Sequence, residues 1–272
     1  MRELATDSLR FWELLRAIAW KSIALRYKQA YLGVVWVVLK PIVLMLIFML
    51  VRSFVGIDSG AVPYPLLAYC ALLPWIFFQE SASEGTGSIV NHAALIRKIY
   101  LPREIFPLAA ALTKVIELCI GLVILIGLML WYDYGFKSMM LWAPLILALT
   151  LLPALTIALA GSALNVYFRD VTQAIPLLLS LAMYASPIMY PLHLVKQKLL
   201  VEQAAGDWSN ALYLVYTMNP LSGLIDSFQR VMLEDLAPDW SAMAPGLALV
   251  ALFLPLSYML FKRAEAHFAD VI

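Results

Sequence analysis

Six apolar stretches, each long enough to cross a lipid bilayer as a helix, constrain this chain more than any other feature of its sequence. A hydrocarbon core about 30 Å thick needs roughly 20 helical residues. Windows of that kind lie at about 32–54, 63–80, 105–132, 140–167, 173–191 and 244–261. The chain is 63% hydrophobic and 14% charged, whereas soluble domains are roughly 45–50% apolar and about 25% charged. We therefore predict an all-α membrane protein with six transmembrane helices in a single transmembrane domain, residues 1–272.

The basic residues outside these stretches divide unevenly between the two sets of connections. One set holds twelve: Arg2, Arg10, Arg16, Lys21, Arg26, Lys28, Arg97, Lys98, Arg103, Arg169, Lys262 and Arg263. The other holds four: Lys137, Lys196, Lys198 and Arg230. Because lysine and arginine concentrate in cytoplasmic loops, both termini are predicted to be cytoplasmic. The net charge of +1 gives no basic excess that would indicate a nucleic-acid partner.

An amphipathic pattern covers residues 8–28. Apolar side chains fall on one side of a helix there, namely Phe11, Leu14, Leu15, Ile18 and Leu25. Arg10, Arg16, Lys21 and Lys28 fall on the opposite side, and Arg26 breaks the pattern. This predicts an interfacial helix on the cytoplasmic surface, with its basic face toward anionic headgroups. A soluble helix packed on a partner would have the same pattern.

A second amphipathic element is predicted at residues 219–234, on the outer side. Asn219 suits an N-cap, and Pro220 suits the first helical position, where a missing N–H costs nothing. Asp226 and Arg230 lie opposite the apolar face and make the element too polar and too short to span. We expect it to dip into or lie on the outer leaflet.

The sequence lacks the common motifs of hydrolases, metalloproteases and nucleotide-binding loops, and its histidines and cysteines are not spaced as metal ligands. His92, His193 and His267 lie in separate connections, and Cys70 and Cys119 lie inside apolar runs. Neither G-x-S-x-G nor H-E-x-x-H is present, and the phosphate-binding pattern G-x-x-x-x-G-K-[ST] is absent too. The expectation is a non-enzymatic chain without catalytic residues, metal or bound cofactor. If ATP drives it, another chain binds the ATP.

Lys40, Lys114 and Glu117 are the most informative charged residues inside the predicted spans. Lys40 lies roughly 12 Å along the first helix, by 1.5 Å per residue from Leu32. It should face a protein interior or a wet path, or else snorkel to the cytoplasmic side. Pro41 is predicted to kink the helix. Lys114 and Glu117, three residues apart, are predicted to form an ion pair.

The connection at residues 94–107, ALIRKIYLPREIFP, mixes bulky apolar and basic residues. Such a mixture suits a protein interface, where apolar anchors lie inside a polar rim. From the residues alone, a solvated interfacial linker and a short helix docked into a partner are equally supported.

The order of motifs along the chain resembles that of the ABC-type polysaccharide export permeases. The motifs are RYKQAYLGVVWVVLKP at 26–41, PWIFF at 74–78, LIRKIYLPREIFP at 95–107, then YFRDV, SPIMYP and NPLSGLI. The chain is most similar to membrane subunits that export O-antigen, with capsule and teichoic acid exporters as close relatives. The resemblance runs from about residue 10 to the end, except for residues 193–218.

The resemblance implies a function and a set of partners. Two permease chains would act with two ATP-binding chains that hold ATP and Mg²⁺, and would move a lipid-linked polysaccharide outward across the bacterial inner membrane. Residues 95–104 match the coupling helix of the family, which implies contact with the ATPase through Arg97, Lys98, Tyr100 and Arg103. The surface helix matches the gate helix, with Arg10, Arg16, Lys21, Arg26 and Lys28. Residues 219–234 match the external re-entrant helices.

The polymer path in this family is the permease dimer interface, lined mainly by the first and fifth helices. The resemblance therefore implies a path through Trp36, Lys40, Tyr184, Ser186 and Tyr190, where flat aromatic faces can support sugar rings. Ordinary helix packing would account for each aromatic equally well.

Two alternatives remain open from the sequence. An ABC exporter of lipids or drugs should have a more hydrophobic substrate path with fewer aromatic residues. An ion-coupled secondary transporter would bind its substrate near the midplane with an ionisable coupling group, for which Lys40, Lys114 and Glu117 are the candidates. A structural membrane anchor would leave Lys40 unexplained.

Overall fold

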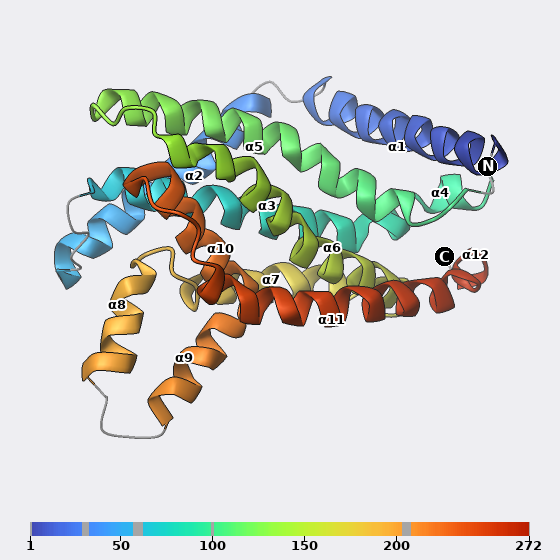
Figure 1. The fold of residues 1–272 in the computed structure, drawn as a ribbon. Helices are drawn as coiled ribbons and strands as arrows, with labels where there is room; N and C mark the ends of the chain where they lie inside the picture. Colours follow the sequence, from blue (N-terminus) through green and yellow to red (C-terminus); the bar gives the residue numbers. More distant parts are fainter. Residues whose placement is uncertain (1, 29–32, 57–61, 99–100, 203–207, 272) are drawn as a thin grey trace.

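The computed structural model describes residues 2–28, 33–56, 62–98, 101–202 and 208–271, and all regular elements in these ranges are helical. The long helices are α1 (Arg2–Lys28), α2 (Gly33–Val55), α3 (Tyr64–Asn91), α5 (Ile105–Trp131), α6 (Ala143–Tyr167) and α11 (Trp240–Glu265). The short ones are α4 (Ala93–Ile96), α7 (Val171–Tyr184), α8 (Leu192–Lys196), α9 (Trp208–Met218), α10 (Pro220–Gln229) and α12 (Phe268–Val271). A 3-10 segment, η1 (Ser138–Trp142), and two π-helical segments, η2 (Gln197–Glu202) and η3 (Arg230–Glu234), complete the set. The predicted all-α class is confirmed for the described residues (Figure 1).

Four segments are long and apolar enough to cross a membrane: Val35–Phe54, Ile105–Trp131, Ser138–Tyr167 and Trp240–Glu265. They coincide with the first, third, fourth and sixth predicted stretches, so the described part of the chain is a multi-pass membrane protein by length and composition. The second and fifth predicted stretches are helical as well, in α3 and α7. Helix α3 is long enough but not apolar enough to be counted with these four segments, and α7 is apolar but too short.

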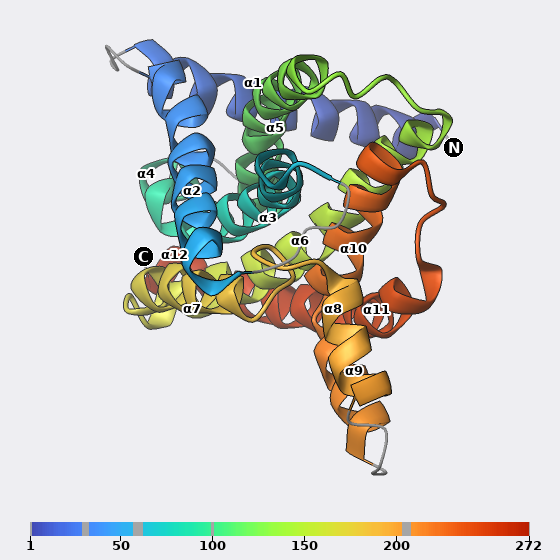
Figure 2. The same ribbon diagram turned by 90° about the vertical axis from the view of Figure 1, so that its left-hand side faces the viewer.

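The second predicted stretch is longer in the structure, because α3 continues beyond residue 80 to Asn91. Polar side chains in this continuation bond to their own helix: the Thr86 hydroxyl donates to the Ala82 carbonyl (2.8 Å) and the Ser88 hydroxyl donates to the Gly85 carbonyl (2.6 Å). Such bonds let small polar residues lie inside a bundle. Helix α3 is the centre of the fold, packed against α2, α5, α6, α7 and α10 (Figure 2).

The fifth predicted stretch is shorter in the structure, because α7 ends at Tyr184 and residues 185–190 form turns. Pro187 lacks the backbone N–H that a continuing helix would use. The turns are fixed to the bundle by two side chains: the Asn219 amide donates to the Ser186 hydroxyl (2.8 Å), and the Tyr64 hydroxyl donates to the Met189 carbonyl (2.9 Å).

The predicted start of the outer amphipathic helix is confirmed. The Asn219 side chain accepts a hydrogen bond from the Leu221 N–H (3.1 Å), and Pro220 is the first residue of α10. The apolar face of this helix is buried inside the protein, since Leu224, Ile225 and Phe228 are fully buried where α10 packs against α3, α6 and α11. That face is therefore covered by helices of this chain.

Helix α1 lies across α5 at an angle to the long helices (Figures 1 and 2). Leu15, Ile18 and Ala19 are buried in a cluster with residues of α5, α6 and α11. The apolar face of the predicted amphipathic helix, α1, therefore packs at least partly against other helices of this chain. Trp12 and Trp20 stay exposed on its outer side, at 63% and 69%.

The elements at the two chain ends lie toward one end of the molecule. The N-terminus, α4, the C-terminal end of α11 and α12 all lie toward the right-hand end of Figure 1, and Figure 2 shows α4 and α12 on one side of that end and the N-terminus on the other. The helices α8 and α9 project away from the bundle elsewhere (Figure 2). The basic connection that contains Arg97 and Lys98 is therefore on the same side as Lys262 and Arg263 near the C-terminus.

Candidate functional site

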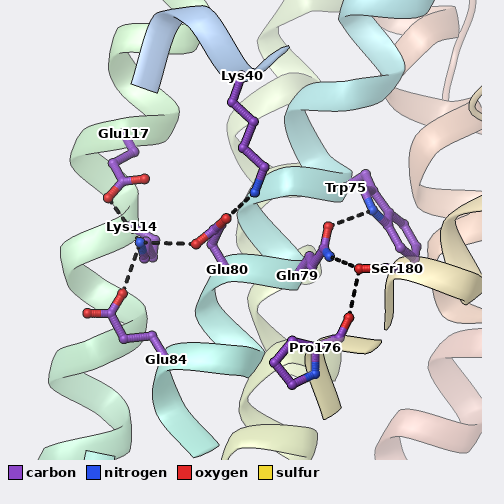
Figure 3. A network of polar contacts seen from close by, with 9 residues as sticks. All are labelled: Lys40, Trp75, Gln79, Glu80, Glu84, Lys114, Glu117, Pro176 and Ser180. Carbon is purple, nitrogen blue, oxygen red and sulfur yellow. Dashed lines mark hydrogen bonds and ion pairs between the residues drawn. The ribbon is translucent and has the colours of Figure 1, made fainter. Parts of the chain in front are cut away.

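Lys114 of α5 is the centre of a network of ion pairs inside the helical bundle (Figure 3). Its ammonium nitrogen lies 2.9 Å from Glu84 Oε2, 3.0 Å from Glu117 Oε1 and 3.4 Å from Glu80 Oε2. The Lys114 side chain is only 4% exposed. A buried ammonium group is tolerated when several carboxylates satisfy its three donors.

The helix that carries Lys40 joins the same network from the other side. The Lys40 ammonium group donates to Glu80 Oε1, while Glu80 Oε2 faces Lys114 (Figure 3). Glu80 thus bridges α2 and α5 through α3. Lys40 thus has a charged partner on α3, and its side chain is 45% exposed.

The neighbouring residue on α3 makes the corresponding contact to α7. The Gln79 amide donates to the Ser180 hydroxyl (3.0 Å), and that hydroxyl donates to the Pro176 carbonyl (2.8 Å). The Trp75 indole N–H donates to Gln79 Oε1 (3.1 Å). Consecutive residues of α3 therefore attach the two flanking helices, Glu80 holding α2 and Gln79 holding α7 (Figure 3).

A cavity of about 310 Å³ opens beside the ion pairs, between α2, α3 and α5. It is lined by Trp36, Val37, Lys40, Pro41, Leu73, Ile76, Phe77, Glu80, Lys114, Glu117, Leu118 and Gly121. Trp36 is 62% exposed at its edge. The arrangement combines an accessible aromatic face with fixed charges, which can bind a partly polar ligand.

Sequence reasoning missed the two carboxylates of α3 that complete the network. It predicted the Lys114–Glu117 pair, and this pair is confirmed at 3.0 Å. Glu84 lies beyond the predicted span, which ended at residue 80, and Glu80 is the last residue of that span. Their spacing of four residues, which places both on one face of a continuous helix, is the signal that could have identified them.

The other residues predicted for the path lie elsewhere. Tyr184 is exposed at the end of α7, and Ser186 is buried against Asn219. The Tyr190 and Tyr216 hydroxyl oxygens are 3.5 Å apart. None of the three predicted residues lines the cavity that holds Trp36 and Lys40. The structure thus brings together two of the five predicted path residues.

The residues predicted to contact an ATPase differ in their surroundings. Arg97 and Lys98 are exposed at the end of α4. Arg103 is held within the chain, because its guanidinium group donates to the Glu265 carbonyl and its backbone N–H donates to Glu265 Oε1 (3.2 Å). Tyr100 lies outside the described residues.

The basic residues predicted for the gate helix all lie in α1. Arg16 and Lys21 are exposed on its surface. The side chains of Arg10, Arg26 and Lys28 fall outside the described part of the structure. Their assignment to a gate stays a prediction.

Three carboxylates converge on one point in this site, which raises the question of a metal ion. The Lys114 ammonium group occupies the position that a cation would take (Figure 3). Within the described residues, no group of three or more His, Cys, Asp or Glu side chains is arranged to hold a metal.

Comparison with known proteins agrees with this architecture. The family model described as ABC-2 type transporter matches residues 13–204. The chain is 24% identical over 272 residues to the O-antigen export system permease protein RfbA of Myxococcus xanthus, covering 100% of both chains. It is 25% identical over 267 residues to the protein of that name from Klebsiella pneumoniae, covering 96% of this chain and 95% of the other. The match to the family model covers well over half of the chain, and the protein therefore belongs to the ABC-2 type transporter family.

Proposed function

We propose that this chain is the transmembrane subunit of an ATP-driven exporter that moves a lipid-linked, O-antigen-like polysaccharide from the cytoplasm to the outer side of the bacterial inner membrane. The observation that carries the proposal is similarity to O-antigen export permeases over the full length of the chain. The helical membrane architecture and an internal cavity with an accessible tryptophan support it.

ATP hydrolysis is assigned to a separate subunit. The sequence has no phosphate-binding loop, and its longest polar connections are too short for a nucleotide-binding domain. Arg97 and Lys98 are exposed and would present two basic groups to such a partner. Two ATP-binding chains, with ATP and Mg²⁺ bound to them, would serve two permease chains.

A second copy of the chain is proposed to cover the exposed faces of α2 and α7. Large apolar side chains point outward from both helices: Val35, Trp36, Leu39, Val43, Leu46, Ile47, Leu50, Leu177, Leu178, Leu181 and Tyr184. In a six-span arrangement, α3 and α7 would cross the membrane along with the four apolar segments, both termini would be cytoplasmic, and α10 would be an outer re-entrant helix. The path would then run along the α2 and α7 faces of the dimer.

The direct test is ATPase activity of the chain co-purified with the ATP-binding subunit and reconstituted into lipid vesicles. The proposal predicts a stable complex whose ATP hydrolysis is stimulated by a lipid-linked polysaccharide. A chain that forms no such complex, and that transports a solute along an ion gradient instead, would contradict it. Stimulation by a simple phospholipid or drug alone would favour the lipid or drug exporter.

Trp36→Ala tests the assignment of the path within this proposal. The substitution removes an exposed ring at the cavity edge, so we expect slower export at an unchanged protein level. Export is measured as polysaccharide displayed outside the cell, and protein level by immunoblot of the membranes. Unchanged export would contradict the assignment of Trp36 to the path and leave it a role in helix packing only.

A further inference from the structure

A groove on the flank of α1 holds an exposed arginine between two exposed tryptophans. It has a volume of about 320 Å³ and lies where α1 crosses α5 (Figures 1 and 2). Trp12, Arg16 and Trp20 line it at intervals of four residues, which places them along one face of the helix. Buried Ala19 and half-buried Leu112 of α5 line it too. The groove therefore joins an apolar floor to a rim that is exposed in the described part of the chain.

The Arg16 guanidinium group is available to a ligand. Its side chain is exposed, and it forms no ion pair or hydrogen bond with the residues that the structure describes. Glu13, three residues earlier on α1, is exposed as well and is not bonded to it. A guanidinium group carries five N–H donors in a planar fork that matches the oxygens of a phosphate group.

The groove lies at a depth where the surface of a membrane is expected. Leu112 is roughly 10 Å along α5 from Ile105, where a candidate membrane span begins. Tryptophan rings favour the headgroup level of a bilayer, and an arginine stem can lie along apolar surface while its charged end stays among polar groups. A soluble partner would have to displace lipid from α5 to fill this groove, so a lipid is the favoured occupant.

The charge of α1 selects among membrane lipids. The helix contains six basic and three acidic residues, which makes it positive overall. A positive helix on a membrane surface attracts anionic lipids more strongly than zwitterionic ones. The volume of the groove is small for a ligand pocket, which suits part of one acyl chain and the neighbouring phosphate group.

We propose that the groove between α1 and α5 binds an anionic membrane phospholipid. Its phosphate group contacts Arg16, and one of its acyl chains lies along Leu112 between Trp12 and Trp20. The bound lipid extends the contact between α1 and α5 and thereby holds α1 at the membrane surface. This inference rests on the membrane location of the chain and not on the proposed export function.

The test measures lipid binding to the purified, detergent-solubilised chain by native mass spectrometry. Two probes with the same acyl chains are titrated, dioleoyl phosphatidylglycerol and dioleoyl phosphatidylcholine, which differ in the charge of the headgroup. The expected result is an apparent Kd about tenfold lower for the phosphatidylglycerol, because one favourable charge contact separates the two lipids. Free glycerol phosphate, which has the anionic headgroup chemistry without the chains, should not displace the lipid at the same concentration.

Two matched variants locate the binding. Arg16→Gln and Lys21→Gln each remove one exposed positive charge from α1, but only Arg16 lines the groove. The preference for phosphatidylglycerol should fall to about threefold or less in Arg16→Gln and should persist in Lys21→Gln. The two lipids are compared within each variant, so a general loss of folded protein does not alter the ratio.

Three results would overturn the site. Equal affinity of the wild-type chain for both lipids, or an equal loss of preference in both variants, would show that Arg16 does not select the headgroup. Displacement by glycerol phosphate would indicate a general anion site without a place for the acyl chain. Repeating the titration with the ATP-binding subunit bound should leave lipid binding unchanged, and its loss there would show that the groove docks a protein instead.

Discussion

Lys114 and Lys40 lie in one network but differ in the number of carboxylates that each contacts: Lys114 contacts three and Lys40 contacts one. Replacing Lys114 by methionine leaves three carboxylates without their shared partner, which should cost on the order of 3–5 kcal/mol and lower the unfolding temperature by roughly 10 °C. Lys40→Met should cost much less, because Glu80 keeps Lys114 as a partner. Thermal unfolding of the detergent-solubilised chain measures both, and equal losses would contradict this account of the network.

Asp226 of α10, outside the candidate spans, links stability to pH. Burial raises the pKa of its carboxyl from the ordinary 3.8 to about 7, although Arg230 acts in the opposite direction. Between these two values the folded state binds a proton that the unfolded state has lost, so stability falls as pH rises from about 4 to about 7.

The resulting prediction concerns Asp226→Asn, which removes the titrating group. The variant should unfold at least about 2–4 °C above the wild type at pH 8, and the difference should vanish near pH 4. Glu13→Gln, on the exposed surface of α1, serves as the control and should show no such dependence. A pH-independent difference for Asp226→Asn would contradict the link.

The sequence predicted part of the site at this scale. The Lys114–Glu117 pair followed from spacing along one helix, and a protein environment for Lys40 followed from the cost of a charge in lipid. The role of Glu80 could not be predicted, because it depends on how α2 and α5 pack on either side of α3. Such tertiary pairing is not encoded in local periodicity.

At the scale of elements, the closest approach between α3 and α6 depends on glycine. A Cβ atom added to Gly85 would lie 2.4 Å from Ala158 Cβ, whereas one added to Gly127 of α5 would have no neighbour within 4 Å. We expect Gly85→Ala to destabilise the protein by about 1–3 kcal/mol. Gly127→Ala should be neutral or slightly stabilising, since alanine is the better helix former.

Unfolding temperatures of the two alanine variants measure this difference. The pair is matched, because both glycines lie within long helices and both acquire the same methyl group. Equal unfolding temperatures would show that α3 and α6 can separate at Gly85 without cost, and would remove the close contact from the account of the fold.

Helix positions were predicted better than helix ends. Each of the six apolar stretches contains a helix in the described residues, because composition and length indicate where an apolar helix lies. The end of α3 was placed too early because its second half hides polar groups in internal bonds and ion pairs. The end of α7 was placed too late because apolar residues continue past it while Pro187 stops the helix.

At the scale of the whole molecule, the account places the contact with the ATP-binding subunit on the side of the molecule that holds α4 and the C-terminus. Arg97 and Lys98 are exposed there, whereas Arg103 is engaged with Glu265. The double variant Arg97→Glu, Lys98→Glu should therefore lose co-purification of the ATP-binding subunit by about tenfold or more, since each reversal turns attraction into repulsion.

Lys137→Glu provides the control for that experiment. It reverses the basic N-cap residue of η1, which belongs to the connection between α5 and α6. That connection is at the opposite end of α5 from α4 (Figure 1). The control should retain the ATP-binding subunit at the wild-type level. Equal retention in the control and in the double variant would place the docking surface elsewhere.

The most direct measurement of the central claim is the appearance of a lipid-linked polysaccharide on the far side of a vesicle membrane. The chain and its ATP-binding subunit are reconstituted into vesicles with the subunit facing the medium, and the glycolipid is placed in the outer leaflet. After ATP is added to the medium, the fraction of the sugar that becomes protected from an added glycosidase is followed over time. The account predicts protection that requires ATP and is slowed by Trp36→Ala. Protection that proceeds at the same rate without ATP, or that follows an imposed ion gradient, would contradict it.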